Sequence, residues 1–115
     1  MAVIGDGSLQ YSVQCLASAA QHQLKVVYIV PCNGEYAILK EFALLENTPN
    51  VPGLDLPPLD IVSTAKGFGC AATLARTRQE IQAAFTKALS ADGPTVIAVP
   101  IKHQIRPLVR PVSAA

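Results

Sequence analysis

Short runs of consecutive apolar residues alternate along the chain with stretches in which apolar residues recur at helical spacing. Four apolar runs are predicted strands: Ala2–Ile4, Val26–Val30, Cys70–Leu74 and Thr95–Val99. Four stretches with helical spacing are predicted helices: Leu9–Gln21, Tyr36–Leu45, Ile61–Lys66 and the stretch that follows Thr77. Strands that are apolar at consecutive positions are typical of a parallel sheet covered on both faces. The pattern therefore predicts an α/β three-layer sandwich whose sheet is mainly parallel.

Side chains that can accept a hydrogen bond from a free backbone N–H stand where three of these helices begin. Ser8 precedes the first helix and Asp60 precedes the short one, so both are predicted N-caps. Thr77 and Glu80 have the spacing of a capping box, in which each side chain accepts from the other residue's backbone N–H. Prolines break the pattern over residues 46–59, and we expect an irregular loop there of the kind used for lids and flexible segments.

Two polar turns follow the first two predicted strands. They are Gly5-Asp6-Gly7-Ser8 and Cys32-Asn33-Gly34, and Asn33 follows Asp6 by 27 residues. In a strand–helix–strand unit the strands run parallel, so both turns lie at the same edge of the sheet, where α/β proteins bind ligands. A carboxylate and an amide oxygen are ligands that Mg²⁺ accepts, and glycines let the main chain approach a phosphate closely. Each turn alone is ordinary loop chemistry, but the pair favours a site for a metal and a phosphorylated ligand.

The composition is that of a single packed domain. Half of the 115 residues are hydrophobic and 15% are charged, which argues against disorder. Nine basic and eight acidic residues give a net charge of +1 without a basic run, so we expect no nucleic-acid partner. The apolar runs are shorter than the roughly 20 residues that span a bilayer, and the first residues lack a signal-peptide core. We therefore expect a cytoplasmic protein without a membrane partner.

The two turns resemble the thiamine-diphosphate motif of thiamine-dependent enzymes, in which Gly-Asp-Gly-Ser is followed after a helix and a strand by Asn-Gly. The likeness is closest to benzoylformate decarboxylase and its relatives. It extends in order over residues 2–100 through Asn50–Asp55, Ala65–Gly69 and Gly93–Ile97. The resemblance implies that residues 1–100 are the second half of a thiamine-diphosphate-binding domain, hence a partial thiamine-diphosphate-binding fold, and that residues 101–115 are an irregular tail.

The resemblance also implies roles for particular residues. The side chains of Asp6 and Asn33 and the main-chain carbonyl of Glu35 would bind Mg²⁺. Five residues would bind thiamine diphosphate: Gly5, Asp6, Gly7, Ser8 and Tyr36. Ile38 and Phe42, one helical turn apart, would line the pocket of a 2-oxo acid substrate, although packing in the core is an equally good interpretation of each. The bulk of Ile38 would favour a 2-oxo acid smaller than an aryl one.

Two departures from the family bear on function. Cys32 stands where the family usually has an asparagine, although that position is not one that we assign to the metal. The pyrimidine-binding domain, which supplies the activating glutamate from a partner subunit, is absent, and we identify no catalytic residue in this sequence. His22 and His103 are expected to be solvated.

We therefore expect the thiamine-diphosphate- and Mg²⁺-binding portion of a 2-oxo acid decarboxylase, inactive as an isolated chain. Its partners would be the missing pyrimidine-binding domain or a partner subunit, within a homo-oligomer. Two alternatives stay open. One is a non-catalytic α/β remnant or interaction module derived from such an enzyme, and the other is a binding domain for a different phosphorylated ligand.

Overall fold

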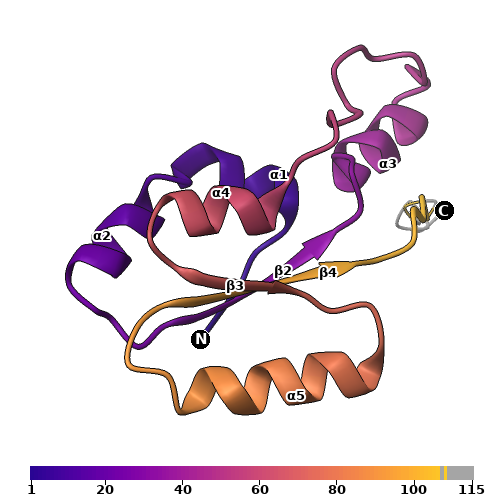
Figure 1. Cartoon of the computed structure of the whole chain (residues 1–115). Coiled ribbons are helices and arrows are strands. Elements are labelled where there is room, and N and C mark those ends of the chain that lie inside the picture. The colour runs from indigo at the N-terminus through magenta and orange to yellow at the C-terminus, as the bar shows by residue number, and fades with distance from the viewer. Residues whose placement is uncertain (107, 109–115) are drawn as a thin grey trace, which may run out of the picture.

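The computed structural model describes residues 1–106 and 108, and within this part of the chain four strands form one parallel sheet (Figure 1). The strands are β1 (Ala2–Val3), β2 (Val27–Cys32), β3 (Ala71–Leu74) and β4 (Thr95–Pro100). Their order across the sheet is β1-β2-β4-β3, and every neighbouring pair is parallel. The central pair is registered along its whole length, from Val27 opposite Thr95 to Cys32 opposite Pro100. The predicted parallel sheet is confirmed.

Helices cover both faces of this sheet. They are α1 (Asp6–Leu9), α2 (Cys15–Gln21), α3 (Ala37–Leu45), α4 (Ile61–Gly67) and α5 (Arg78–Leu89). Figure 1 shows α1, α2 and α4 on one face and α5 on the other, whereas α3 projects beyond the end of β2. This arrangement confirms the predicted three-layer α/β sandwich.

The core consists of two apolar clusters, one on each face of the sheet. Val96 and Ile97 are neighbours in β4, and both are fully buried. Because successive side chains of a strand point to opposite faces, Val96 packs with Leu16 and Ala65 under the α2/α4 layer, and Ile97 packs with Ala88 under α5. The run of consecutive apolar residues in β4 therefore predicted burial on both faces correctly.

The same inference is wrong for β1. Val3 is 62% exposed, although the apolar run Ala2–Ile4 predicted a strand buried on both faces. Among the described residues β1 pairs only with β2, which leaves its other edge open. Apolar sequence does not bury a strand at the edge of a sheet unless another element covers it.

The predicted helix Leu9–Gln21 is divided, and Ser8 is not its N-cap. Helical geometry begins at Asp6, and Gly5 in extended conformation is the N-cap. A 3-10 turn over Gln10–Ser12 then separates α1 from α2. Its three side chains are exposed, so no core contact holds the turn in α geometry. Within α2 the buried residues are Leu16 and Ala19, which are three residues apart and so share one face of the helix.

The other two predicted caps are confirmed. The Asp60 carboxylate accepts from the backbone N–H of Ser63 at 2.9 Å, at the start of α4. Thr77 and Glu80 form a capping box at the start of α5, with Glu80 N–H donating to the Thr77 hydroxyl at 3.2 Å. The partners of each bond are only three positions apart, so a short stretch of sequence contains both of them.

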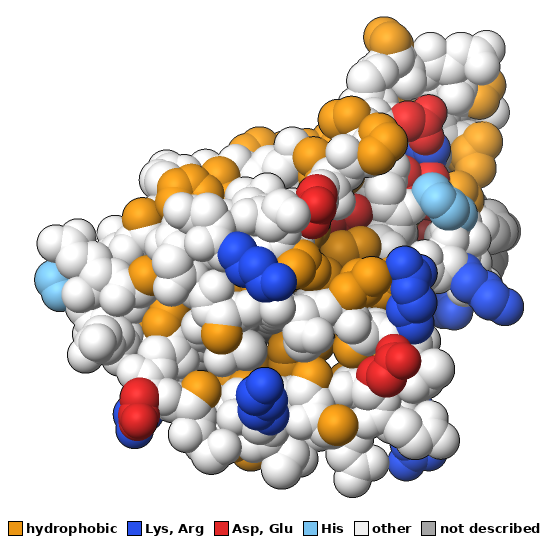
Figure 2. Space-filling view, in the orientation of Figure 1, with side chains coloured by type: hydrophobic (Ala, Val, Ile, Leu, Met, Phe, Trp, Pro, Cys, Tyr) orange, Lys and Arg blue, Asp and Glu red, His pale blue; other side chains and the backbone are white. Residues whose placement is uncertain are grey.

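The apolar stripe predicted on α3 does not face the core. Ile38 is 52% exposed and Phe42 is 49% exposed, and Leu39 on the same helix is 46% exposed. Core packing is therefore the wrong interpretation of Ile38 and Phe42. Figure 2 shows apolar side chains gathered where α3 and the following loop project from the molecule.

The loop over residues 46–59 is irregular, as predicted, but it is anchored to the second polar turn. Tyr36 N–H donates to the Leu54 carbonyl and Leu56 N–H donates to the Gly34 carbonyl, both at 2.9 Å. No helix in residues 1–106 and 108 is long and apolar enough to cross a membrane. Residues 101–106 contain no helix or strand, and the rest of the predicted tail, apart from residue 108, lies outside the described residues.

Candidate functional site

The two polar turns lie in contact at the carboxyl ends of β1 and β2. The strands are parallel neighbours, and the pairing continues past β1 through the bond from Ile4 N–H to the Ile29 carbonyl at 3.0 Å. Asp6 then joins the turns, because its Oδ1 accepts from Gly7 N–H at 2.9 Å and its Oδ2 accepts from Gly34 N–H at 2.8 Å. One carboxylate therefore holds together segments that are 28 residues apart in the sequence.

The Asp6 carboxylate is buried without a cation. Asp6 is only 4% exposed, and no Lys, Arg or His within the described part of the chain forms an ion pair with it. Two backbone N–H groups compensate part of its charge, but a buried carboxylate is costly unless it is paired or bound to a metal. A carboxylate has about four lone-pair positions, so two remain available. Asp6 thus fits the role of a ligand to a cation.

The turn after β2 holds two further oxygen atoms in fixed positions. Glu35 N–H donates to Asn33 Oδ1 at 3.2 Å, which orients the amide and leaves Oδ1 one further lone pair. Gly34 has a φ of +70°, a conformation that glycine adopts without strain. The Glu35 main-chain carbonyl accepts no hydrogen bond from residues 1–106 or 108. Asn33 and Glu35 therefore each offer an oxygen close to the turn that Asp6 holds.

This donor set suits Mg²⁺ in its chemistry, because it combines a carboxylate with two neutral oxygens. In the described part of the chain no three His, Cys, Asp or Glu side chains gather into a metal-binding cluster. The proposed set needs none, since its other two ligands are an amide and a main-chain carbonyl. Burial, followed by the nearby Asp6 charge, raises the pKa of the Cys32 thiol. That thiol remains protonated at neutral pH and does not compete for a hard cation.

A second polar cluster, for which the sequence carries no signal, links this turn to α3, the irregular loop and His103. The Glu35 side chain is 4% exposed, and its Oε2 lies 2.7 Å from Lys40 Nζ and 3.4 Å from His103 Nδ1. Lys40 also pairs with Asp55 of the irregular loop. Hydrogen bonding to Lys40 lowers the pKa of Glu35 against the opposing effect of burial. Only proximity in the fold assembles these groups, and no local spacing in the sequence indicates it.

Tyr36 packs against the first turn. A Cβ atom placed on Gly7 would lie 2.7 Å from Tyr36 Cε1, so the ring occupies the space that any other residue would need. Burial raises the pKa of Tyr36, and the neighbouring Tyr11 and Asp6 raise it further. Gly7 is thus required for packing between the turns, whereas space is open beside Gly5, where a methyl group would meet nothing within 4 Å.

The structure brings most of the predicted site residues together and leaves three of them on the surface. Gly5, Asp6, Gly7, Asn33, Glu35 and Tyr36 belong to the two contacting turns. Ser8 is exposed in α1, next to these turns. Ile38 and Phe42 lie on α3, which begins directly after Tyr36, and both are about half exposed at 52% and 49%. Their position next to the turn is compatible with a pocket wall, but the described residues do not enclose one around them.

A family model and a sequence relative of this chain agree on one family of proteins. Residues 1–99 match the family model described as thiamine pyrophosphate enzyme, C-terminal TPP binding domain. Benzoylformate decarboxylase from Pseudomonas aeruginosa is 45% identical over 98 residues, which are 85% of this chain and 19% of that protein.

Two solved structures extend the likeness to the fold. The benzoylformate decarboxylase of Polynucleobacter necessarius superposes with a TM-score of 0.89 at 50% identity, over 92% of this chain and 20% of that one. The thiamine diphosphate-dependent 4-hydroxybenzoylformate decarboxylase of Rhodococcus jostii superposes with a TM-score of 0.87 at 41% identity, over 90% of this chain and 20% of that one. The chain thus spans about a fifth of the length of these relatives, 19% to 20%.

Proposed function

We propose a function on the premise that this chain belongs to the thiamine pyrophosphate enzyme family, as its C-terminal TPP-binding domain. The chain is the part of a benzoylformate decarboxylase-like 2-oxo acid decarboxylase that anchors the diphosphate of thiamine diphosphate through Mg²⁺. One observation carries the proposal. The buried Asp6 joins both polar turns and has no cation partner among the described residues.

In this proposal the metal ligands are the side chains of Asp6 and Asn33 and the main-chain carbonyl of Glu35. Their support is chemical, since all three present oxygen atoms at adjoining turns and all three retain unused acceptor positions. The open space beside Gly5 and the exposed Ser8 give the diphosphate access to the first turn. When bound, thiamine diphosphate supplies the carbanion stabilisation that decarboxylation requires. Gly7 and Tyr36 complete the cofactor-binding set by holding the two turns against each other.

The substrate is proposed to be a 2-oxo acid that contacts Ile38 and Phe42. Both side chains are exposed on α3, which begins directly after the second turn. From there they would contact a substrate bound to the cofactor. The bulk of Ile38 favours an acid smaller than an aryl one, although the relatives named above are described as benzoylformate decarboxylases. Turnover of pyruvate against benzoylformate in a full-length homologue with this helix tests the point, and a preference for benzoylformate would refute it.

Activity is proposed to require more than this chain. Most of this chain, 85% and 92% of it, covers only 19% and 20% of two of the relatives. A pyrimidine-binding domain, supplied by a partner subunit of a homo-oligomer in the cytoplasm, would complete the site. The exposed edge of β1 and the exposed apolar face of α3 are surfaces that such a partner could cover. The alternative is a non-catalytic α/β remnant that keeps the fold without binding the cofactor.

Isothermal titration calorimetry separates these two functions. The chain is titrated with thiamine diphosphate in the presence of Mg²⁺ and then of EDTA, and we expect weak, saturable heat only with the metal. Asp6→Asn keeps the shape of the side chain but removes its charge, and it should abolish that heat. Asp92→Asn is the matched control, because Asp92 is an exposed carboxylate paired with Lys25.

A second readout does not depend on the cofactor. Mn²⁺ replaces Mg²⁺ and broadens the NMR signals of nearby nuclei, so broadening should centre on the backbone amides of Gly7, Gly34 and Glu35. Broadening centred elsewhere, or an unchanged pattern in Asp6→Asn, would refute the assigned ligands. Absence of heat in every calorimetric arm would favour the remnant.

A further inference from the structure

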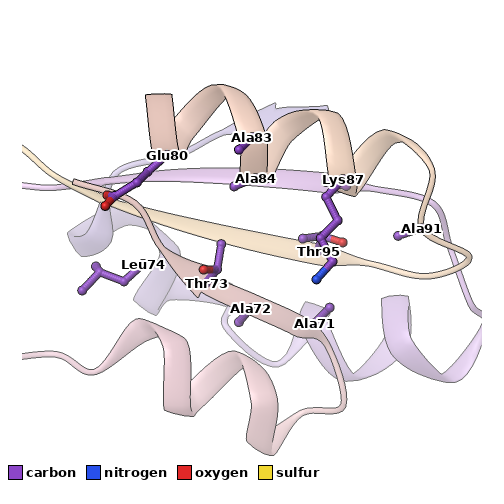
Figure 3. Close-up of a pocket in the computed structure, with 11 residues that line it drawn as sticks. Ala71, Ala72, Thr73, Leu74, Glu80, Ala83, Ala84, Lys87, Ala91 and Thr95 are labelled. Atoms are coloured by element: carbon purple, nitrogen blue, oxygen red, sulfur yellow. The ribbon is translucent and has the colours of Figure 1, made fainter. Parts of the chain in front are cut away.

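A groove of about 450 Å³ lies between α5 and two neighbouring strands, the edge strand β3 and the inner strand β4 (Figure 3). Its walls are mostly alanine side chains: Ala71, Ala72, Ala83, Ala84, Ala88 and Ala91. Two of its lining residues, Ala71 and Thr95, are the first residues of β3 and β4. The polar turns follow the carboxyl ends of β1 and β2, so this part of the groove lies at the opposite end of the sheet.

The groove contains a buried hydroxyl that lacks a partner. Thr95 is 8% exposed, and no group among the described residues hydrogen-bonds with its Oγ1. Polar groups buried in folded proteins almost always have a partner. Thr95 lines the groove, so a molecule bound there could supply the missing hydrogen bond.

The groove also contains a cation that makes no ion pair. Lys87 extends from α5 toward the beginning of the strands, as Figure 3 shows. Within residues 1–106 and 108 no carboxylate pairs with its ammonium group. The acidic residue of the groove, Glu80, is already engaged, since it accepts from Arg76 N–H at 2.6 Å and from Thr77 N–H at 3.1 Å.

We propose that this groove is a second binding site, for a small monocarboxylate with a flat apolar body. The carboxylate binds between the Lys87 ammonium and the Thr95 hydroxyl, where it makes a charge-assisted hydrogen bond and satisfies Oγ1. The apolar body of the ligand packs against the alanine side chains. Their single methyl groups project little from the helix and strand, which leaves room for a flat ring. The volume of about 450 Å³ is within the range of small-molecule sites.

The charges in the groove restrict the ligand to one carboxylate. Glu80 and Lys87 are separated by two turns of α5, about 10 Å along the helix axis. A single carboxylate at Lys87 therefore leaves the apolar body between the two residues. A second carboxylate at the far end of the ligand would approach Glu80 and be repelled. The site does not rest on the proposed cofactor function, because it shares no residue with the two polar turns.

The test uses benzoate as the probe and the full chain labelled with ¹⁵N. Benzoate is titrated while backbone amide signals are followed, and we expect saturable shifts at residues 71–74 and 83–91. Lys87→Gln and Thr95→Val should each weaken binding, the former by about tenfold or more. Lys66→Gln is the matched control, since Lys66 lies in the last turn of α4 on the other face of the sheet, and it should bind like the original chain.

Neutral benzamide and doubly charged terephthalate complete the design, and both should bind more weakly than benzoate. Ala71→Leu, at the exposed rim of β3, blocks the groove without touching either polar group, and it keeps the test decisive if Thr95→Val does not fold. Absence of saturable shifts, shifts confined to residues 5–8 and 33–36, or equal binding by Lys87→Gln would each overturn the proposal. Failure to bind thiamine diphosphate would leave it unaffected.

Discussion

Replacement of Gly7 by alanine should loosen the contact between the two polar turns, whereas the same change at Gly5 should not. A Cβ atom on Gly7 would lie 2.7 Å from Tyr36 Cε1, 3.1 Å from Tyr36 Cδ1 and 3.3 Å from Leu56 Cδ1. The first of these distances is shorter than Cβ atoms tolerate, so the aromatic ring must move. Tyr36 precedes α3, and its N–H bonds the irregular loop through Leu54, so its displacement disturbs both segments.

The magnitude follows from two opposing terms. Overpacking a filled position costs about 1–3 kcal/mol. Alanine in place of a helical glycine raises the unfolding free energy by roughly 0.5–1 kcal/mol, because the unfolded chain loses backbone conformational freedom. The remaining loss of unfolding free energy at Gly7 is about 1 kcal/mol, which lowers Tm by about 4 °C in a chain of this size.

The control reverses the sign of the expected effect. Gly5 has a φ of −63° and a ψ of 155°, which alanine adopts without strain, and nothing lies within 4 Å of the new methyl group. Gly5→Ala should therefore leave the unfolding free energy unchanged or raise it by up to about 1 kcal/mol. Urea unfolding of the metal-free chain at fixed pH measures both variants. If Gly7→Ala is at least as stable as Gly5→Ala, packing of Tyr36 is not the reason for this glycine.

Two further predictions concern the metal-free fold. Because Lys40 holds the pKa of Glu35 below its usual value of 4.5, this ion pair stabilises the folded chain above that pH, and its contribution is lost as pH falls through the folded-state pKa. Glu35→Gln should lower stability at pH 7 and flatten the acid loss in urea titrations, and an unchanged acid profile would contradict this. Ile97→Ala removes a fully buried side chain and should cost about 2–5 kcal/mol. Leu89→Ala, at a side chain that is 65% exposed, should change the unfolding free energy by no more than about 0.5 kcal/mol, and urea unfolding measures both variants.

Features that depend on near neighbours in the chain were predictable from the sequence. The Asp60 cap and the capping box of Thr77 and Glu80 need only partners three residues apart. The parallel sheet followed from apolar runs separated by helical stretches, and fully buried residues in β4 confirm it. The contact between the two polar turns followed from the same pattern, since neighbouring parallel strands end at one edge of a sheet. The assignment of metal and cofactor ligands within those turns stays a prediction.

The tertiary structure alone decided which apolar and charged side chains meet. The Glu35–Lys40–Asp55 cluster unites a turn, a helix and an irregular loop, and no periodicity relates those positions. A 3-10 turn over Gln10–Ser12 divides the first predicted helix, and the exposed side chains of that turn have no core contact that would hold it in α geometry.

The sequence also did not predict which apolar residues are exposed at the edge of the sheet and on the projecting helix α3. Val3 and Ile38 have the apolar character of core residues, yet both are more than half exposed, at 62% and 52%. A sequence pattern states which face of an element is apolar, whereas burial requires a second surface that lies against that face. In this chain the local pattern determined the elements and the position of the polar turns, and the nonlocal contacts determined which of their surfaces are covered.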